Sequence, residues 1–600
     1  MAADGYGHHE DEILGKAYDA RLIKRLGAYV KPYRSYIFLA IVLLIIATIA
    51  ELAGPLITKY AIDNYIIPKK LDGLPRIIGL FVLVLTLKFI LQYFQVYITE
   101  WVGQKTVYDL RMKIFSHIEE LGLSFFDKNP VGRLVTRTTS DVESLNELFT
   151  EGVVSIFGDI VTLFGIIGIM LYLNWKLALV SLVVIPLLFV ATIIFRAKVR
   201  ESFRRIRTRI ARLNAFVQEH IAGMWVVQSF VAERRTFQKF DAINSDLRDN
   251  HLKSVFYFAV FFPVVEILGA VSLALIIWYG GSEIIKGTLT FGALVAFIQY
   301  AERFFKPIRD LSEKYNILQN AMASSERIFR LIDVEPDVRE PEEPSMPMTL
   351  QGGIKFENLF FAYNDDEWVL KDINMEIKPG EKIAIVGATG AGKTSIISVL
   401  LRFYNFQRGD IKIDGISIKD LSIKDYRRNI ALVLQDIFIF SGDITRNVRL
   451  GNSDISDENV TKALQTVGAE HFVNGLDGGI KHELRERGSN LSIGQRQLLA
   501  FARALAFDPR ILILDEATSS VDTQTEILIQ EALQKLLEGR TSIIIAHRLS
   551  TIKYVDRIIV MHKGVIKEQG THAELLALGG IYHRLYQLQY KDQETLGKVA

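Results

Sequence analysis

The sequence contains no cysteine among its 600 residues. This absence excludes disulfides, thiol catalysis and metal sites built from cysteine. Net charge is also nearly absent, at +2, so the overall charge gives the chain no attraction to nucleic acid. Residues 1–12 are polar and acidic, and their lack of an apolar stretch predicts that no cleaved signal peptide precedes the fold.

Apolar residues are abundant instead. They make up 50% of the chain, while 23% of the residues are charged and the mean hydropathy is +0.21. A soluble protein with this much charge is rarely so apolar, so we expect apolar and charged residues to be segregated along the sequence. A chain of this length also predicts several domains rather than one core.

Apolar stretches recur six times in the first half of the sequence. Each is close to the ~20 residues that a helix needs to cross the hydrocarbon core of a bilayer. Buried helices of a large soluble protein are the alternative, but six repeats with polar intervals favour membrane spans. The predicted spans are 36–57, 76–98, 153–173, 177–195, 255–280 and 291–308.

The distribution of Lys and Arg predicts the orientation of these spans. The segment before the first span and the interval after the fourth are rich in both residues, which marks them as cytoplasmic. The third and fifth intervals contain only Lys176 and Lys286. The first interval disagrees, because it should lie outside and yet carries Lys59, Lys69, Lys70 and Arg76. Because the two cytoplasmic clusters are larger, we keep the orientation that they predict.

Two intervals, 99–152 and 196–254, are long, charged and periodic like helices. Helices that continue from the membrane into the cytoplasm would produce this pattern, whereas solvated loops are the alternative. We predict that short turns near Leu123–Lys128 and Ala211–Ile221 dock onto a cytoplasmic domain.

Ionisable residues within the predicted spans include Lys88, Asp159 and Glu266. Charged side chains are costly in lipid and usually face a cavity or a partner. Our hypothesis is that Lys88 and Glu266 line or gate a polar route. Alternatively, these residues form a buried structural pair or lie close to the membrane–water interface.

The chain becomes acidic and proline-rich after Leu331, a composition that does not fold by itself. From about Gly353, patterns typical of strands and helices alternate, which predicts an α/β domain. The expected organisation is a cytoplasmic segment (1–35), a transmembrane domain (36–320), a linker (321–352), a nucleotide-binding domain (353–590) and a C-terminal tail (591–600).

A glycine-rich motif of the form GxxxxGK[ST] follows the predicted strand 382–386. Its glycines let backbone N–H groups curl around phosphate oxygens, and the helix that it opens adds positive potential. The lysine would neutralise the β- and γ-phosphates, and the threonine hydroxyl would bind Mg²⁺. The predicted phosphate-binding residues are Gly387, Ala388, Thr389, Gly390, Ala391, Gly392, Lys393, Thr394 and Ser395.

The apolar strand 511–514 ends in two acidic residues, Asp515 and Glu516. Asp515 can hold the Mg²⁺ shell, which places Glu516 as general base or water-positioning residue for attack on the γ-phosphate. Strands often end in acidic residues merely for solubility, so the two acids alone would be weak evidence. They become informative because a phosphate loop precedes them in the sequence.

The segment Leu491-Ser-Ile-Gly-Gln495 resembles the signature peptide of ATP-binding-cassette (ABC) proteins. The resemblance extends from about residue 20 to 590, in the order of a bacterial multidrug half-transporter with the type-1 exporter fold. It implies that Tyr363 stacks on adenine, that Gln435 lies near Mg²⁺ and the attacking water, and that His547 contacts the γ-phosphate. It further identifies Ser519–Asp522 as the D-loop, with Asp522 at the nucleotide, and Arg485–Gly488 as the cross-talk loop.

The same resemblance implies a catalytic set of Lys393, Gln435, Glu516 and His547, and a metal set of Thr394, Gln435 and Asp515. The expected cofactors are ATP and Mg²⁺. Two cassettes should pair head to tail, so that Ser492, Gly494 and Gln495 contact the nucleotide held by the partner. We therefore expect a multi-pass protein of the cytoplasmic (inner) membrane whose cassette is cytoplasmic.

The signature peptide departs from the family sequence Leu-Ser-Gly-Gly-Gln at Ile493. A β-branched residue there should hinder the approach to phosphate or demand a different backbone angle. Because Glu516 and His547 are intact, our hypothesis is a heterodimer whose partner has a good signature and an altered catalytic acid. The predicted function is ATP-driven export of amphipathic small molecules, with a lipid or lipid-linked flippase as the main alternative and an ATP-gated channel as a weaker one.

Overall fold

The computed structural model describes residues 19–345, 350–364, 367–515, 523–546, 552 and 554–596. The chain divides into two compact units according to its internal contacts. The first, which we call the membrane unit, extends to Glu119 and resumes at Val131–Val334. The second, the sheet unit, contains Glu120–Pro130 and the chain from Glu335 onward.

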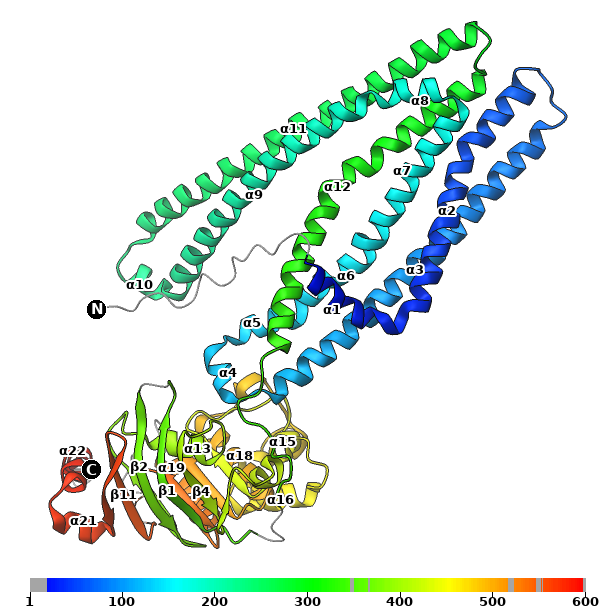
Figure 1. Cartoon of the computed structure of the whole chain (residues 1–600). Coiled ribbons are helices and arrows are strands. Elements are labelled where there is room, and N and C mark those ends of the chain that lie inside the picture. The colour runs from blue at the N-terminus through cyan, green and yellow to red at the C-terminus, as the bar shows by residue number, and fades with distance from the viewer. Residues whose placement is uncertain are drawn as a thin grey trace. The chain divides into compact units, whose positions relative to one another are not determined.

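The described part of the membrane unit is helical (Figure 1). Short 3₁₀ or π-helical segments, η2 to η5, join several of the helices. The elements are α1 (Ala20–Val30), η2 (Lys31–Tyr33), α2 (Arg34–Ala61), η3 (Ile62–Ile66), α3 (Leu74–Glu120), α5 (Val131–Thr136), η4 (Arg137–Asp141), α6 (Val142–Glu147), η5 (Leu148–Val153), α7 (Val154–Leu173), α8 (Trp175–Leu182), α9 (Val184–Ala222), α10 (Met224–Ser229), α11 (Glu233–Ile285) and α12 (Phe291–Ile332).

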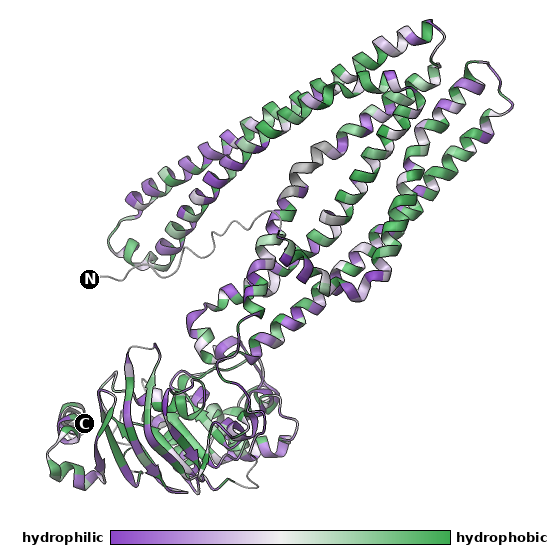
Figure 2. Cartoon of the chain, in the orientation of Figure 1, coloured by the Kyte–Doolittle hydropathy of each residue, from purple (hydrophilic) through white to green (hydrophobic). Residues whose placement is uncertain are grey.

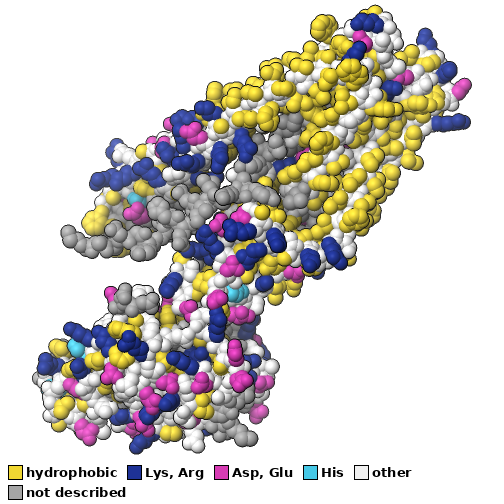
Figure 3. Space-filling view, in the orientation of Figure 1, with side chains coloured by type: hydrophobic (Ala, Val, Ile, Leu, Met, Phe, Trp, Pro, Cys, Tyr) yellow, Lys and Arg dark blue, Asp and Glu magenta, His cyan; other side chains and the backbone are white. Residues whose placement is uncertain are grey.

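Five helical stretches of the described chain are long and apolar enough to cross a membrane. They contain the first five predicted spans, and the sixth forms the beginning of α12, where Glu302, Arg303 and Lys306 interrupt the apolar sequence. Large apolar side chains such as Phe38, Phe89 and Phe164 are about 70% exposed. Figure 3 shows such side chains covering much of the visible surface of this unit. A lipid environment explains why they are not buried within the protein.

The helices α9 and α11 are much longer than a bilayer is thick. α11 has 53 residues, so its length is about 80 Å, against ~30 Å of hydrocarbon. Figure 2 shows both helices changing from hydrophobic to hydrophilic along their length. Together with the 47-residue α3, they confirm that the charged intervals after the second and fourth spans contain helical extensions of those spans.

One of the two predicted docking turns is wrong in position. Residues Ala211–Ile221 lie inside α9, and the chain reverses only afterwards, around the short helix α10. Gly223 ends α9 because its backbone is not helical. The apolar periodicity of the preceding residues is that of a helix, so it does not mark where the turn lies. The other turn is a helix with the predicted bounds, α4 (Leu123–Lys128), and it belongs to the sheet unit.

An ion pair with a buried carboxylate joins two parts of the membrane unit. The carboxylate of Asp141, a residue only 5% exposed, accepts hydrogen bonds from Arg327 Nε at 2.9 Å and from Ser324 Oγ at 3.1 Å. Both donors lie on α12, which continues to Ile332 and therefore passes the boundary that we predicted at residue 320.

The sheet unit alternates strands and helices. Its helical elements are α4, α13 (Lys393–Leu400), α14 (Ile423–Arg428), α15 (Ile444–Arg449), α16 (Asp457–Thr466), α17 (Glu470–Asn474), η6 (Gly479–Lys481), η7 (Glu486–Gly488), α18 (Ile493–Ala506), α19 (Thr523–Leu537), α21 (His572–Leu578) and α22 (Ile581–Leu596). Its strands are β1 (Ile354–Ala362), β2 (Trp368–Ile377), β3 (Lys382–Val386), β4 (Arg408–Ile413), β5 (Ile416–Ser417), β6 (Ile430–Val433), β7 (Gly442–Asp443), β8 (Glu483–Leu484), β9 (Ile511–Asp515), β10 (Thr541–Ile545), β11 (Arg557–His562) and β12 (Val565–Gly570).

The main sheet of this unit has six strands in the order β12-β11-β3-β10-β9-β6. All neighbours are parallel except β12, which is antiparallel to β11. A second sheet, β2-β1-β4-β5, is antiparallel. Parallel strands buried on both faces need apolar residues throughout, and the sequences Ile511–Leu514 and Ile543–Ile545 provide them.

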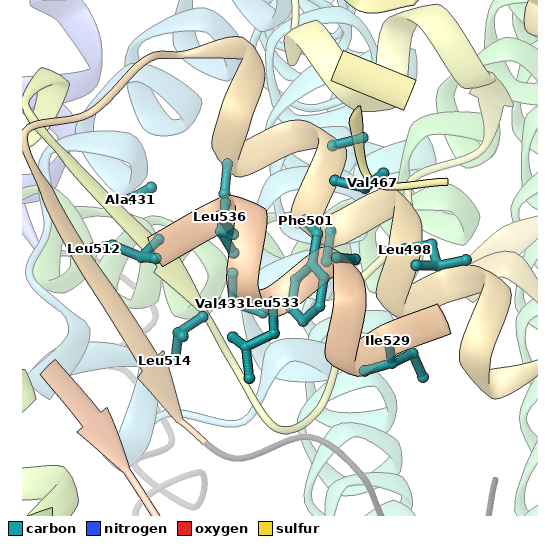
Figure 4. Packing of buried hydrophobic residues seen from close by; sticks show 14 of the residues in the cluster. Ala431, Val433, Val467, Leu498, Phe501, Leu512, Leu514, Ile529, Leu533 and Leu536 are labelled. Atoms are coloured by element: carbon teal, nitrogen blue, oxygen red, sulfur yellow. The ribbon is translucent and has the colours of Figure 1, made fainter. Parts of the chain in front are cut away.

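Alternate residues of the six-stranded sheet enter two different hydrophobic clusters. Leu512 and Leu514 of β9 pack with α18 and α19 through Phe501 and Leu533, as Figure 4 shows. Ile511 and Ile513 instead join the cluster that contains α13 and the four-stranded sheet. Successive side chains of a strand point to opposite faces, so α13 and α18 cover opposite faces of the sheet.

Part of the acidic linker runs along the sheet unit without regular structure. The carboxylate of Glu340 accepts hydrogen bonds from the N–H of Ile423, at the start of α14. The N–H of Ser345 donates to the carbonyl of Asp420 at 2.8 Å. Polar contacts, rather than a core of its own, therefore position this segment.

Candidate functional site

The glycine-rich loop lies between the end of β3 and the start of α13. Gly390 and Gly392 have left-handed backbones, with φ of +79° and +99°. A Cβ atom on Gly392 would also lie 2.9 Å from Leu370 Cδ2, and one on Gly387 would lie 2.3 Å from the carbonyl oxygen of Met561. The loop can therefore adopt this tight path only because these positions have no side chain.

Lys393 begins α13 beneath this loop and is only 6% exposed. Its ammonium group donates to the carbonyl oxygens of Gly387 at 2.8 Å and Ala388 at 3.2 Å. The following residue, Thr394, exposes its side chain. A buried ammonium, the N-terminus of a helix and a glycine-rich turn together form a site suited to the phosphates of a nucleotide.

Tyr363 comes directly after β1 and lies beside the phosphate loop. Its hydroxyl is 3.1 Å from Ser395 Oγ in the first turn of α13. Its ring makes edge contacts with Phe361 and Tyr404, at centroid distances of 4.7 and 5.0 Å. The side chain is still 42% exposed, so one face of a fixed aromatic ring is accessible to a nucleotide base.

Asp515 and the phosphate loop lie at the same edge of the six-stranded sheet. The strands β3, β10, β9 and β6 are parallel, so their carboxyl ends meet there, and Asp515 pairs in register with Ile545. Gln435 follows β6 by two residues and is exposed. Ligand sites of parallel sheets form at this edge. The predicted residues Glu516, Ser519, Ser520, Val521, Asp522 and His547 lie outside the described residues.

The signature peptide forms the start of α18. Ser492 caps the helix and accepts a hydrogen bond from the N–H of Gln495, whose side chain accepts one from the N–H of Ser492. The N–H groups of the first helical residues cannot find acceptors within the helix, so Ile493 and Gly494 present theirs at its end. This end of α18 is therefore suited to an anion such as a phosphate.

The structure corrects one of the two effects that we predicted for Ile493. The residue is the first of α18, has ordinary helical backbone and is 47% exposed. The capping box holds the helix start in a conformation that any residue can adopt, so isoleucine requires no different backbone angle here. The other predicted effect, a bulky side chain beside the N–H groups, is consistent with this exposure.

Arg496 is a site residue that the sequence did not reveal. From the first turn of α18, its guanidinium donates to the carbonyl oxygens of Gly488 at 3.3 Å and Leu491 at 3.1 Å. These hydrogen bonds connect the predicted cross-talk loop, Arg485–Gly488, to the start of the signature helix. No local pattern marks an arginine for this role, because its acceptors are backbone carbonyls.

The membrane unit contains a polar cavity of about 560 Å³ between α2, α3, α7, η5 and α12. Lys88 lines it, and its ammonium lies 2.9 Å from the carboxylate of Glu51. Asp159 lines it as well and accepts a hydrogen bond from Lys314. Glu266 lies on α11, is exposed and does not line this cavity, so of the two residues expected to line a polar route only Lys88 lines this one. Sequence position alone could not show which charged residues on different helices meet.

These features define an ATPase domain with a phosphate loop, fused to a bundle of membrane helices. Comparison with protein families agrees: residues 37–308 match the ABC transporter transmembrane region, and residues 370–519 match the ABC transporter family. The chain belongs to the ABC transporter family. It is a multi-pass membrane exporter whose cytoplasmic ATPase domain is coupled to transport.

Relatives match the chain over nearly its full length. An uncharacterized ABC transporter ATP-binding protein of Bacillus subtilis, YknV, is 41% identical over 97% of both chains. An ATP-dependent lipid A-core flippase of Syntrophus aciditrophicus is 36% identical over 96% of both chains. A probable multidrug resistance ABC transporter ATP-binding/permease protein of Bacillus subtilis, YheH, is 37% identical over 91% of this chain and 81% of its own. The relatives therefore have the same domain organisation and differ in named substrate.

Proposed function

We propose that the chain is one half of a heterodimeric exporter that uses ATP hydrolysis to move amphipathic small molecules across the cytoplasmic membrane. The observation that carries this proposal is the phosphate loop, in which the backbone carbonyls of Gly387 and Ala388 hold the buried ammonium of Lys393. The ABC ATPase domain implies ATP as the nucleotide. Its triphosphate supplies the negative charge that such a loop binds.

Within the half-site, Lys393 neutralises the β- and γ-phosphates, and Tyr363 offers its exposed face to adenine. Thr394, Gln435 and Asp515 would hold Mg²⁺, which supplies positive charge against the phosphate oxygens. Their positions around one edge of the sheet fit this role, since hydroxyl, amide and carboxylate oxygens are ligands that Mg²⁺ accepts.

Two further residues complete the proposed chemistry. Glu516 follows Asp515 and acts on the attacking water as general base or positioning residue. His547 follows β10 after one residue and contacts the γ-phosphate, while Asp522 of the D-loop lies near the nucleotide. Lys393 and the loop N–H groups stabilise the charge that develops on the transferred phosphoryl group.

A second chain is needed because the signature peptide and the phosphate loop act on different nucleotides. The positions of α13 and α18 support this requirement, because the two helices cover opposite faces of the sheet. The phosphate loop precedes one of these helices and Ser492 precedes the other. With Ser492, Gly494 and Gln495 the chain contributes to the partner's site, where Ile493 places bulk beside the N–H groups. The partner supplies an intact signature to the site that contains Glu516.

The cavity of the membrane unit supports amphipathic cargo. Its charged residues can meet a polar or ionised group, and Gln92, Val96 and Glu100 border both this cavity and a second pocket. That second pocket, of about 490 Å³, is also lined by Phe89, Tyr93 and Tyr97. A polar cavity next to an aromatic pocket suits a molecule with one charged and one apolar part.

A lipid flippase is the second candidate, because the same two pockets suit a lipid and one relative is named a lipid A-core flippase. Reconstitution into vesicles separates the two candidates. A multidrug exporter accumulates amphipathic dyes in inverted vesicles on addition of ATP, whereas a flippase moves labelled lipids between leaflets and leaves the dyes in place.

The experiment for the ATPase and its partner uses the native complex, isolated through a tag on this chain. We expect a second half-transporter to copurify, with an intact signature and an altered catalytic acid. Glu516→Gln should lower ATP turnover by about 100-fold or more while the nucleotide stays bound. The control Glu538→Gln changes an exposed acid beyond α19 and should not alter turnover. Normal hydrolysis by Glu516→Gln would refute its assigned role, and robust ATPase activity of the chain alone would refute the heterodimer.

A further inference from the structure

Tyr404 lies on the loop after α13 and contacts the aromatic ring proposed to stack on adenine. The rings of Tyr404 and Tyr363 are perpendicular, at 89°, with centroids 5.0 Å apart. Phe361, which is almost fully buried, makes a similar edge contact with Tyr404 at 5.9 Å. Edge-to-face packing among three rings fixes the orientation of Tyr404 relative to Tyr363.

The hydroxyl of Tyr404 donates a hydrogen bond to the carboxylate of Asp127 on α4. Burial raises the pKa of Tyr404, and the hydrogen bond to Asp127 raises it further, so the hydroxyl keeps its proton at physiological pH. The two residues are 277 positions apart in the sequence. α4 connects two helices of the membrane unit, yet by its contacts it belongs to the sheet unit.

A second hydrogen bond joins α4 to the rest of the sheet unit by a separate route. Ser124 is only 7% exposed, and its hydroxyl donates to the carboxylate of Asp337 in the linker. This bond involves neither Tyr363 nor Tyr404. Within the described residues, α4 therefore has two side-chain hydrogen bonds to the rest of the sheet unit. One ends on Tyr404, which contacts Tyr363, and the other ends on Asp337, whose carbonyl accepts a hydrogen bond from Asn405.

The connected route is short and continuous. Ser395, next to Thr394 in the phosphate-loop helix, lies 3.1 Å from the Tyr363 hydroxyl. Tyr363 packs against Tyr404, and Tyr404 donates to Asp127. Any change in the position of the Tyr363 ring must therefore be accommodated by Tyr404, and hence by its bond to α4.

We propose that Tyr404 is a positioning residue through which α4 senses the nucleotide. The proposal rests on the ATP-binding function proposed above. A base seated against Tyr363 restricts the ring, and Tyr404 passes that restriction to Asp127, so that α4 is held more firmly when ATP is bound. Binding energy can shift α4 in this way only if the contact differs between the two states, and the Tyr404 hydroxyl provides that difference.

Hydrogen exchange of the full-length chain in lipid nanodiscs tests the proposal, with and without MgATP. In the unmodified chain, ATP should slow exchange both in the phosphate loop (387–395) and in α4 (123–128). Tyr404→Phe keeps the ring but removes the hydroxyl. It should retain protection of the phosphate loop while the ATP response of α4 falls at least fivefold.

Ser124→Ala is the matched control, because it removes the other hydrogen bond of α4. This variant should raise exchange of α4 in both conditions and leave its ATP response in place. Asp127→Ala removes the acceptor while both tyrosine rings remain, and it should lose the response as Tyr404→Phe does. This second variant keeps the test valid if Tyr404→Phe disturbs the aromatic cluster.

An ATP response of α4 that persists in both Tyr404→Phe and Asp127→Ala would overturn the proposal. Equal loss of the response in Ser124→Ala would overturn it too, because Tyr404 would then only anchor the helix. If the unmodified chain shows ATP protection of the phosphate loop and none of α4, this inference fails while the proposed function stands. If the phosphate loop itself is not protected, the proposed function fails and this inference fails with it.

Discussion

The ammonium of Lys88 on α3 lies 2.9 Å from the carboxylate of Glu51 on α2, inside the polar cavity of the membrane unit. Both side chains are partly exposed to the cavity, at 27% and 37%. A partly exposed pair of this kind contributes only about 1 kcal/mol, because exposed charges are screened by solvent. Its charges are therefore accessible to a transported molecule at a modest cost in stability.

We predict that Lys88→Met lowers the transport rate roughly fivefold, the factor that corresponds to about 1 kcal/mol. The variant leaves the carboxylate of Glu51 without its lysine and changes the charge that a substrate meets. Vesicle transport of an amphipathic dye measures the effect. Glu266→Gln is the matched control, since Glu266 lies outside this cavity, and it should transport normally. Unchanged transport by Lys88→Met would show that the pair is only structural.

Gly392→Ala should weaken ATP binding by the phosphate loop. The substitution combines a left-handed backbone, at φ of +99°, with a Cβ atom 2.9 Å from Leu370 Cδ2, and strain of this kind costs about 1–3 kcal/mol. A loss of roughly tenfold or more in ATP affinity is expected, as measured with a fluorescent nucleotide. Gly380→Ala provides the control, because Gly380 also has positive φ, at +78°, but lies in open space outside the loop. Comparable loss in both variants would contradict the steric explanation.

Ile493→Gly should raise the ATPase activity of the purified chain when no partner is present. Removing the exposed side chain opens the N–H groups at the start of α18 to phosphate, and a single such donor is worth about 100-fold in rate. A steady-state ATPase assay measures the gain. Ile493→Ala keeps Cβ and should give a smaller gain. If Ile493→Gly remains as inactive as the unmodified chain, Ile493 is not what limits the homodimer.

The stability of the sheet unit should depend on pH through Glu357 on β1. Its carboxylate lies 2.8 Å from Lys355 and 2.6 Å from Lys412, which lowers its pKa from 4.5 to about 2. As the pH falls, the Glu357 carboxylate of the unfolded chain is protonated at a higher pH than that of the folded chain. The ionised carboxylate therefore contributes its full amount to the free energy of unfolding above about pH 4.5. It is lost as the pH falls towards 2.

Glu357→Gln removes this dependence. The variant should unfold at a lower temperature than the unmodified chain at pH 7, and the difference should shrink between pH 4.5 and 2. Thermal unfolding of the detergent-solubilised chain measures it. Glu538→Gln, which changes an exposed acid away from the two lysines, should show no such convergence. A difference that stays constant over this pH range would contradict the prediction.

Local sequence predicted the elements whose cause is local. Apolar runs long enough for a bilayer marked the spans, because every backbone group in lipid must bond within its own helix. The glycines before Lys393 marked the phosphate loop, since only glycine tolerates its backbone. α4 was also predicted at its observed residues, and the strand ending at Asp515 was recognised by its buried apolar run.

The tertiary structure decided which distant residues meet, because such contacts depend on packing and have no local signature. The sequence predicted Lys88 but not its partner Glu51, and after the fourth span the chain reverses around α10 rather than at Ala211–Ile221. It also gave no reason to connect Tyr404 with Asp127. Sequence determines which side chains a helix or strand carries, whereas the packing of helices and sheets determines the side chains that they face.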